Sequence, residues 1–145
     1  MNVAEAFTLL AANGMSFDFF TTEGMDVVIQ HAVMDIQMRL EDSVEKILRA
    51  RGRPAVMMCD RGTMDGSAYM EKESWEEFLK SRGTTETEIR DSRYNAVFHM
   101  VSAADGAENF YTLENNQART EDAEKARMMD KKTQNAWVGH SHLYV

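Results

Sequence analysis

The spacing of hydrophobic positions changes along the chain, and these changes predict its main elements. Over residues 22–51 apolar residues recur at three- and four-residue steps, which predicts one long amphipathic helix. Residues 55–59 and 96–101 are instead continuously apolar, which is typical of short strands buried on both faces. Residues 142–145 begin a third strand. The apolar positions of the long helix are Met25, Val28, Ala32, Ile36, Leu40, Val44 and Ile47.

Shorter helices are predicted between these elements. Residues 1–12 are rich in Ala and Leu and favour a short helix. The sequences S-W-E-E at 74–77 and T-E-T-E at 85–88 each have a capping-box pattern, which predicts the starts of two helices. A polar, charged helix is expected over residues 114–137. Residues 15–23 carry three phenylalanines, for which packing in the core is favoured over lining a pocket.

The alternation of helices and strands is typical of a parallel α/β sheet, so we expect a three-layer architecture in one domain, residues 1–145. Ligands of such sheets lie at the carboxyl ends of the strands, where Asp60 and Arg61 follow the first apolar run. An aspartate there often holds a nucleotide-bound Mg²⁺, although a plain strand-ending turn is the more common explanation. Asp65 is a second acid nearby, which a surface turn explains equally well. His99, inside the second apolar run, is more often a core histidine than a ligand.

Composition restricts the class of partner. Acidic residues outnumber basic ones 24 to 16, and the net charge of −8 argues against non-specific nucleic-acid binding. Cys59 is the only cysteine, so no disulfide forms within the chain and a reducing compartment is expected. No apolar run approaches the roughly 18 residues of a membrane span, and the N-terminus lacks the pattern of a signal peptide. We therefore expect a cytoplasmic protein.

Several runs are specific enough to indicate a family. They are M-C-D-R-G-T-M-D-G-S-A-Y at 58–69, W-E-E-F-L at 75–79, R-D-S-R-Y-N-A-V-F-H-M-V-S-A-A-D-G-A-E-N-F-Y-T at 90–112, A-R-T-E-D-A-E-K-A-R at 118–127 and A-W-V-G-H-S-H-L at 136–143. In this order they resemble the P-loop kinase-like, AAA-type ATPase domain of the TRPL-translocation-defect proteins and the NadR-type ribosylnicotinamide kinases. The V-A-E-A at 3–6 is similar to the V-P-E-A segment after the second strand of that family, with Ala4 where proline is usual.

The resemblance implies that an intact domain binds ATP or GTP with Mg²⁺ and transfers or hydrolyses the γ-phosphate. It makes Asp60 the Walker-B-like carboxylate for the metal, with Arg61 beside the metal and phosphates. Glu5 would take the proton of the phosphoryl acceptor. Arg119 and Arg127, on a helix that resembles a lid, would neutralise charge on the transferred group. Without the family, two arginines on a solvated helix explain that segment equally well.

One departure from the family changes what is expected of the chain. The phosphate cradle G-x-x-x-x-G-K-[ST] is absent, because none of the eight glycines is followed by lysine. The resemblance therefore predicts a nucleoside-kinase-like P-loop fold that is incomplete at its N-terminus, without the first strand, the P-loop and the following helix. The chain alone is expected to be inactive. A shortened gene product and a remnant completed by a partner are both open.

The animal relatives imply a second class of function. In that alternative the protein is a non-catalytic module that binds GTP or a phosphoinositide and takes part in trafficking.

Overall fold

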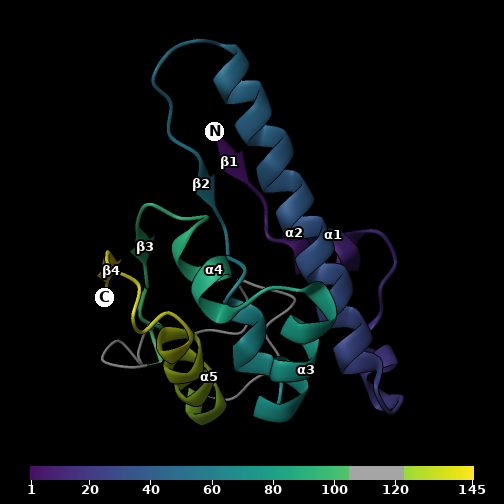
Figure 1. Cartoon of the computed structure of the whole chain (residues 1–145). Coiled ribbons are helices and arrows are strands. Elements are labelled where there is room, and N and C mark those ends of the chain that lie inside the picture. The colour runs from purple at the N-terminus through teal and green to yellow at the C-terminus, as the bar shows by residue number, and fades with distance from the viewer. Residues whose placement is uncertain (105–122) are drawn as a thin grey trace. The chain divides into compact units, whose positions relative to one another are not determined.

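The structure, a computed structural model, describes residues 1–104 and 123–145, and the chain divides into an N-terminal unit, Met1–Thr84, and a C-terminal unit, Thr85–Val145 (Figure 1). The elements of the N-terminal unit are β1 (Asn2–Val3), α1 (Ala6–Ala12), the 3-10 helix η1 (Phe17–Thr21), α2 (Met25–Ala50), β2 (Met58–Cys59), the 3-10 helix η2 (Asp65–Tyr69) and α3 (Lys72–Arg82). Those of the C-terminal unit are α4 (Glu86–Asp91), β3 (Val97–Phe98), α5 (Ala123–Ala136) and β4 (Leu143–Tyr144).

The strands form two separate parallel pairs. In the N-terminal unit β1 pairs with β2 in the register Val3↔Cys59, and in the C-terminal unit β3 pairs with β4 in the register Phe98↔Tyr144. The predicted parallel direction of the strands is therefore confirmed. A continuous three-layer sheet is not seen in the described ranges.

The predicted strands are shorter and more exposed than expected. The run 55–59 contributes only the two residues of β2, and the run 96–101 only those of β3. Met58 of β2 is 66% exposed and Phe98 of β3 is 70% exposed, so the prediction that both faces are buried is wrong. Among the described residues each of these strands has one paired neighbour, which leaves large apolar side chains in solvent. The other large apolar residues of these runs that are exposed are Val56, Met100 and Val101.

The long helix α2 is confirmed, but its buried face is not the predicted one. Two of the positions expected to face the core, Val28 and Ile47, are more than half exposed. The residues that α2 buries are Ile29, Met34, Gln37, Glu41 and Leu48. They also recur at helical spacing and include two polar residues, which an apolar pattern cannot identify.

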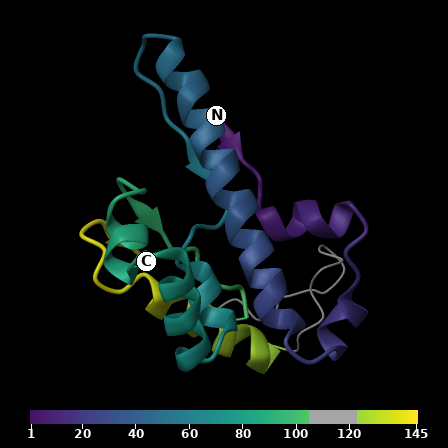
Figure 2. The ribbon, with the colours of Figure 1, turned by 45° about the vertical axis from the view of Figure 1, so that its right-hand side comes forward.

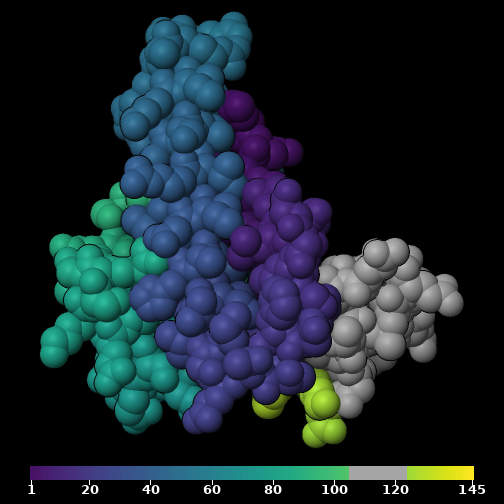
Figure 3. All heavy atoms as spheres, turned by 90° about the vertical axis from the view of Figure 1, so that its right-hand side faces the viewer, coloured from purple at the N-terminus to yellow at the C-terminus, as the bar shows by residue number. Residues whose placement is uncertain are grey.

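The strand pair of the N-terminal unit lies along α2, as two views of the ribbon show (Figures 1 and 2). A space-filling view shows the N-terminal segment, in purple, packed against α2, in blue (Figure 3). The prediction of one helix over residues 1–12 is wrong in part, because this segment forms β1 first and only then α1. A two-residue strand is too short to have a detectable period.

Helix α3 contacts α2 through aromatic rings and one arginine. Trp75 and Phe78 are buried and stacked, with ring centroids 5.1 Å apart, and His31 of α2 lies 4.4 Å from the Phe78 ring. Arg82 donates from Nη1 to Asp35 Oδ1 at 2.8 Å. The helix begins at Lys72 without a side-chain cap, so the capping box predicted at 74–77 is wrong. Trp75 lies inside α3 and not at its start. Burial of Trp75 and its neighbours, and not a side-chain cap, stabilises the helix at this place.

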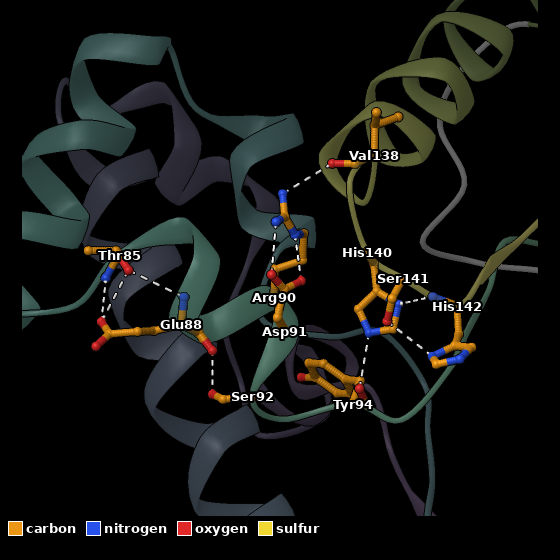
Figure 4. A network of polar contacts seen from close by, with 10 residues as sticks. All are labelled: Thr85, Glu88, Arg90, Asp91, Ser92, Tyr94, Val138, His140, Ser141 and His142. Atoms are coloured by element: carbon orange, nitrogen blue, oxygen red, sulfur yellow. Dashed lines mark hydrogen bonds and ion pairs between the residues drawn. The ribbon is translucent and has the colours of Figure 1, made fainter.

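The second capping box is confirmed at the start of α4 (Figure 4). Thr85 Oγ1 accepts from the backbone N–H of Glu88, and Glu88 Oε2 accepts from the backbone N–H of Thr85 at 2.9 Å. The described part of the last long helix is α5, and the predicted start of this helix at residue 114 lies outside the described residues.

The three phenylalanines of residues 15–23 do not enter the core. Phe17, Phe19 and Phe20 are exposed on η1, and the rings of Phe17 and Phe20 pack against each other and against Phe7 of α1. The prediction of core packing is wrong here, because the short 3-10 helix gathers the rings at the surface. Within the described ranges, no helix is both long enough and apolar enough to cross a lipid bilayer.

Candidate functional site

The carboxyl ends of β1 and β2 bring together the acidic and basic residues singled out from the sequence. Because the two strands are parallel, the segments that follow them leave from the same edge of the pair. The backbone N–H of Asp60 donates to the Val3 carbonyl at 2.9 Å, so Asp60 lies beside the end of β1. Glu5 follows two residues after Val3 and precedes α1. Asp60 is exposed at this edge.

Glu5 and Arg61 meet across the edge. The Arg61 Nε lies 3.4 Å from Glu5 Oε1, and Glu5 Oε2 accepts a hydrogen bond from Thr8 Oγ1. Both side chains are partly exposed, so this pair contributes less than about 1 kcal/mol to stability. The contact brings the two functional groups together at the end of the strand pair.

Neighbouring residues stabilise the positive charge of Arg61. Burial acts to lower the pKa of Arg61, but the electrostatic effects of Tyr69, Asp65 and Glu5, together with the hydrogen bond to Glu5, outweigh it and raise the pKa above its ordinary value. Arg61 is therefore a permanent cation at physiological pH, as an anionic ligand requires.

The loop after Asp60 has an unusual backbone that is held from two sides. Arg61 has φ of 68°, the only positive φ of a non-glycine residue in the described ranges. Its carbonyl accepts from Gln37 Nε2 of α2 at 3.2 Å. The next N–H, of Gly62, donates to Asp65 Oδ2 at 2.8 Å. Asp65 accepts from the loop backbone, as in a turn, but it is buried, so the expected position at the surface is wrong.

Two residues of this arrangement, Gln37 and Glu41, were missed in the sequence analysis. Gln37 is 3% exposed and Glu41 is 2% exposed, and Gln37 Nε2 donates to Glu41 Oε1 at 2.8 Å. Their spacing of four residues places both on one side of α2. They lie one and two turns after Met34, on the side of α2 that continues to Leu48. This spacing was the signal in the sequence that could have identified them. The hydrophobic pattern alone assigned this face to solvent.

In the C-terminal unit, two residues of α5 hold the loop that follows β3. Arg127 Nη1 donates to the carbonyl of the buried Ala104 at 2.8 Å. Asp130 Oδ1 accepts from the Ser102 N–H at 3.0 Å and lies 3.3 Å from His99 Nε2, although the angle of that second contact does not make a hydrogen bond. The His99 side chain is buried, as expected of a core histidine. The expectation that its polar atoms are satisfied is wrong, because no hydrogen-bond partner reaches Nε2 in the described ranges. Arg119 lies outside the described residues.

The described residues suit a metal ion that is bound mainly by phosphate oxygens and water and by few protein side chains. No group of three or more His, Cys, Asp or Glu side chains in the described ranges is arranged to hold a metal. Mg²⁺ in nucleotide sites needs only one or two protein carboxylates, because phosphate oxygens and water complete its coordination. The exposed carboxylate of Asp60 at the strand end meets that requirement.

Comparison with known proteins identifies the family. A family model described as AAA domain matches residues 3–145. The chain belongs to this AAA domain family. The AAA domain is an α/β fold of the P-loop NTPase type with a nucleotide-binding, NTPase-like function. Neither the curated proteins nor the solved structures give a match to the chain.

The AAA domain assignment covers Val3 of β1 and every later element, and with them Glu5, Asp60 and Arg61 at the carboxyl ends of β1 and β2. The phosphate cradle itself is not encoded in the 145 residues.

Proposed function

We propose that this AAA domain is the kinase-like portion of an NTPase that binds ATP or GTP with Mg²⁺ and transfers or hydrolyses the γ-phosphate. One observation carries the proposal: Glu5, Asp60 and Arg61 converge at the carboxyl edge of the parallel pair β1 and β2. This edge is where α/β proteins bind their ligands. Two carboxylates and a permanently charged guanidinium are suited to a metal-bound polyphosphate.

Each residue has a distinct role in this proposal. Asp60, which is exposed, would hold the Mg²⁺, and the metal when bound supplies charge neutralisation between phosphate oxygens. Arg61 would bind phosphate oxygens through its planar guanidinium. Glu5 would accept the proton of the attacking hydroxyl or water. Its Oε1 and Oε2 are already oriented by Arg61 and Thr8, so the carboxylate is held in one position before a substrate arrives.

We further propose that the first strand, the P-loop and the following helix are supplied from outside these 145 residues. β2 and β3 each pair with one strand in the described ranges, and both carry exposed apolar side chains. A further strand with its helix would pair with such an edge and cover that surface. The backbone N–H groups and lysine of a P-loop would then provide the contacts to the β- and γ-phosphates that this chain lacks.

Arg119 and Arg127 are proposed as the charge-neutralising residues of the lid, on the strength of the resemblance. Arg127 is engaged with the Ala104 carbonyl at 2.8 Å. For Arg127 to reach a phosphoryl group, that hydrogen bond has to be exchanged for the ligand. A bond to a neutral carbonyl is weaker than one to a phosphate oxygen, so a bound nucleotide favours the exchange.

The test separates catalysis from binding. The chain is produced with the coding sequence upstream of Met1, which is examined for an in-frame G-x-x-x-x-G-K-[ST]. In this extended protein, Arg127→Ala and Glu5→Gln are expected to lower kcat by at least about tenfold while changing nucleotide affinity much less, because both groups act mainly in the transition state. Arg49→Ala is the matched control, since Arg49 is exposed on α2 and pairs only locally with Glu45.

Changes in Kd without any change in kcat would contradict phosphoryl transfer. That result would leave the alternative of a non-catalytic GTP- or phosphoinositide-binding trafficking module. An upstream sequence without the motif would instead indicate that a partner supplies the cradle.

A further inference from the structure

The peptide unit between Arg61 and Gly62 is held at both of its polar ends by side chains from elsewhere in the N-terminal unit. Its carbonyl oxygen accepts from Gln37 Nε2 at 3.2 Å, and its N–H donates to Asp65 Oδ2 at 2.8 Å. Gln37 comes from the middle of α2, 24 positions before Arg61. Rotation of this peptide would break both hydrogen bonds, so the path of the backbone next to Asp60 is fixed.

Packing does not explain the presence of Gln37 at its position. Gln37 and Glu41 lie on the buried face of α2 between Met34 and Leu48, where leucine or methionine would bury more apolar surface. The orientation of the Gln37 amide is also determined. A flipped amide would turn Oε1 toward the Glu41 carboxylate and the Arg61 carbonyl, which are both acceptors.

This orientation has a cost. With Nε2 donating to two acceptors, Gln37 Oε1 is buried and no donor in the described ranges reaches it. A buried polar atom without a partner destabilises the fold, and such groups are found where function requires them.

We propose that Gln37 is a positioning residue of the nucleotide site: together with Asp65 it clamps the Arg61–Gly62 peptide and thereby directs Asp60 and Arg61 toward the ligand. The proposal rests on the function proposed above. Arg61 is in the left-handed region, with φ of 68°, a conformation that is unfavourable for a residue with a Cβ. Because Gly62 tolerates many conformations, the peptide between the two residues is free to rotate once the clamp is lost.

The first arm of the test examines the clamp itself in the 145-residue chain. Gln37→Met keeps the length of the side chain and removes its donor, and Lys46→Met, the control, removes a donor from an exposed side chain of α2. We expect Gln37→Met to shift the NMR resonances of the Gly62 amide and the Arg61 Nε–H. It should also speed Gly62 amide exchange at least about tenfold, because the peptide is then held only by Asp65 and its N–H can turn away from that acceptor. Lys46→Met should leave these signals unchanged.

Variants of Asp65 examine the other end of the clamp and remain informative if Gln37→Met does not fold. Asp65→Ala removes the acceptor for the Gly62 N–H and is expected to reproduce the shifts. Asp65→Asn retains an oxygen acceptor and is expected to restore most of the wild-type signals. Unchanged Arg61 and Gly62 signals in both Gln37→Met and Asp65→Ala would overturn the proposal.

The second arm measures Mg-dependent ATP or GTP affinity by calorimetry in the protein extended with its upstream sequence. Gln37→Met is expected to weaken that affinity at least about tenfold, whereas Lys46→Met leaves it unchanged. The positioning role would be refuted if Gln37→Met changed the Arg61 and Gly62 signals in the first arm but left the nucleotide affinity unchanged in the second. If the wild-type extended protein binds no nucleotide, the proposed function fails, while the first arm still decides whether Gln37 and Asp65 hold this peptide.

Discussion

Replacement of Gly139 by alanine tests how closely Arg90 packs against the turn between α5 and β4. Gly139 has φ of 101°, and a Cβ at this position would lie 2.6 Å from Arg90 Nη1 and 3.0 Å from its Cζ. Arg90 also donates from Nη1 to the Val138 carbonyl at 3.2 Å and forms a bidentate pair with Asp91 (Figure 4). Alanine therefore introduces two costs: backbone strain and displacement of the guanidinium.

Gly14 separates the two costs. Its φ is 100°, almost that of Gly139, but an added Cβ would meet nothing within 4 Å. Strain alone makes Gly14→Ala cost about 1 to 2 kcal/mol. In Gly139→Ala the guanidinium has to retreat by nearly an ångström, which lengthens the Val138 contact beyond hydrogen-bond distance and adds about 1 kcal/mol.

Amide hydrogen exchange measures both variants within their own units. For Gly139→Ala the reporters are the N–H groups of Val97 and His99, which donate across the β3 and β4 pair. For Gly14→Ala they are the N–H groups of Met58 and Asp60. The free energy of opening should fall by about 1 kcal/mol more in Gly139→Ala, a further fivefold in exchange rate. Adding Arg90→Ala to Gly139→Ala should remove that excess. Equal losses in the two glycine variants would refute the crowding by Arg90.

Three further predictions concern other parts of the chain. Asp130→Ala should lower the free energy of unfolding by about 2 to 3 kcal/mol in denaturant melts, because it leaves the Ser102 N–H without its acceptor, whereas Asp130→Asn keeps an acceptor and should cost less than half as much. The hydrogen bond from Arg90 lowers the pKa of Asp91 from its ordinary value of 3.8, so the stabilisation by this pair is present above that value and is lost as the pH falls through the lowered value. Asp91→Asn should accordingly show a smaller loss of stability than the wild type when melts at about pH 3 and pH 6 are compared. The 145-residue chain alone should bind ATP or GTP no better than about millimolar and should bind an apolar dye through its exposed strand residues, and micromolar affinity by calorimetry would contradict this.

The features predicted correctly from the sequence are those with a long repeat or a local chemical signature. α2 was found because its helical spacing extends over 26 residues, and the Thr85 and Glu88 box because both partners lie within one turn. The two-residue strands are too short to have a pattern of their own. Their exposure depends on which elements cover them, and this information is not contained in the apolar runs 55–59 and 96–101.

The candidate site could be predicted only in part. Asp60 was singled out because an acid ending an apolar run is visible in the sequence, and Glu5 and Arg61 came from the resemblance. Gln37 and the positive φ of Arg61 could not be predicted, because both depend on a contact between residues 24 positions apart. The face of α2 that is buried also depends on contacts with residues far away in the sequence, and it therefore differs from the most apolar face.

The most direct test of the central claim is a calorimetric titration of Mg-nucleotide into the protein extended with its upstream sequence, comparing Asp60→Asn with the wild type. Asp18→Asn serves as a control with the same change of charge at an exposed position on η1. If Asp60 holds the metal at the carboxyl edge of β1 and β2, its replacement should weaken Mg-dependent binding at least about tenfold, and Asp18→Asn should have no effect. Equal Mg-dependent affinities in all three proteins would contradict the assignment of this edge as the nucleotide site.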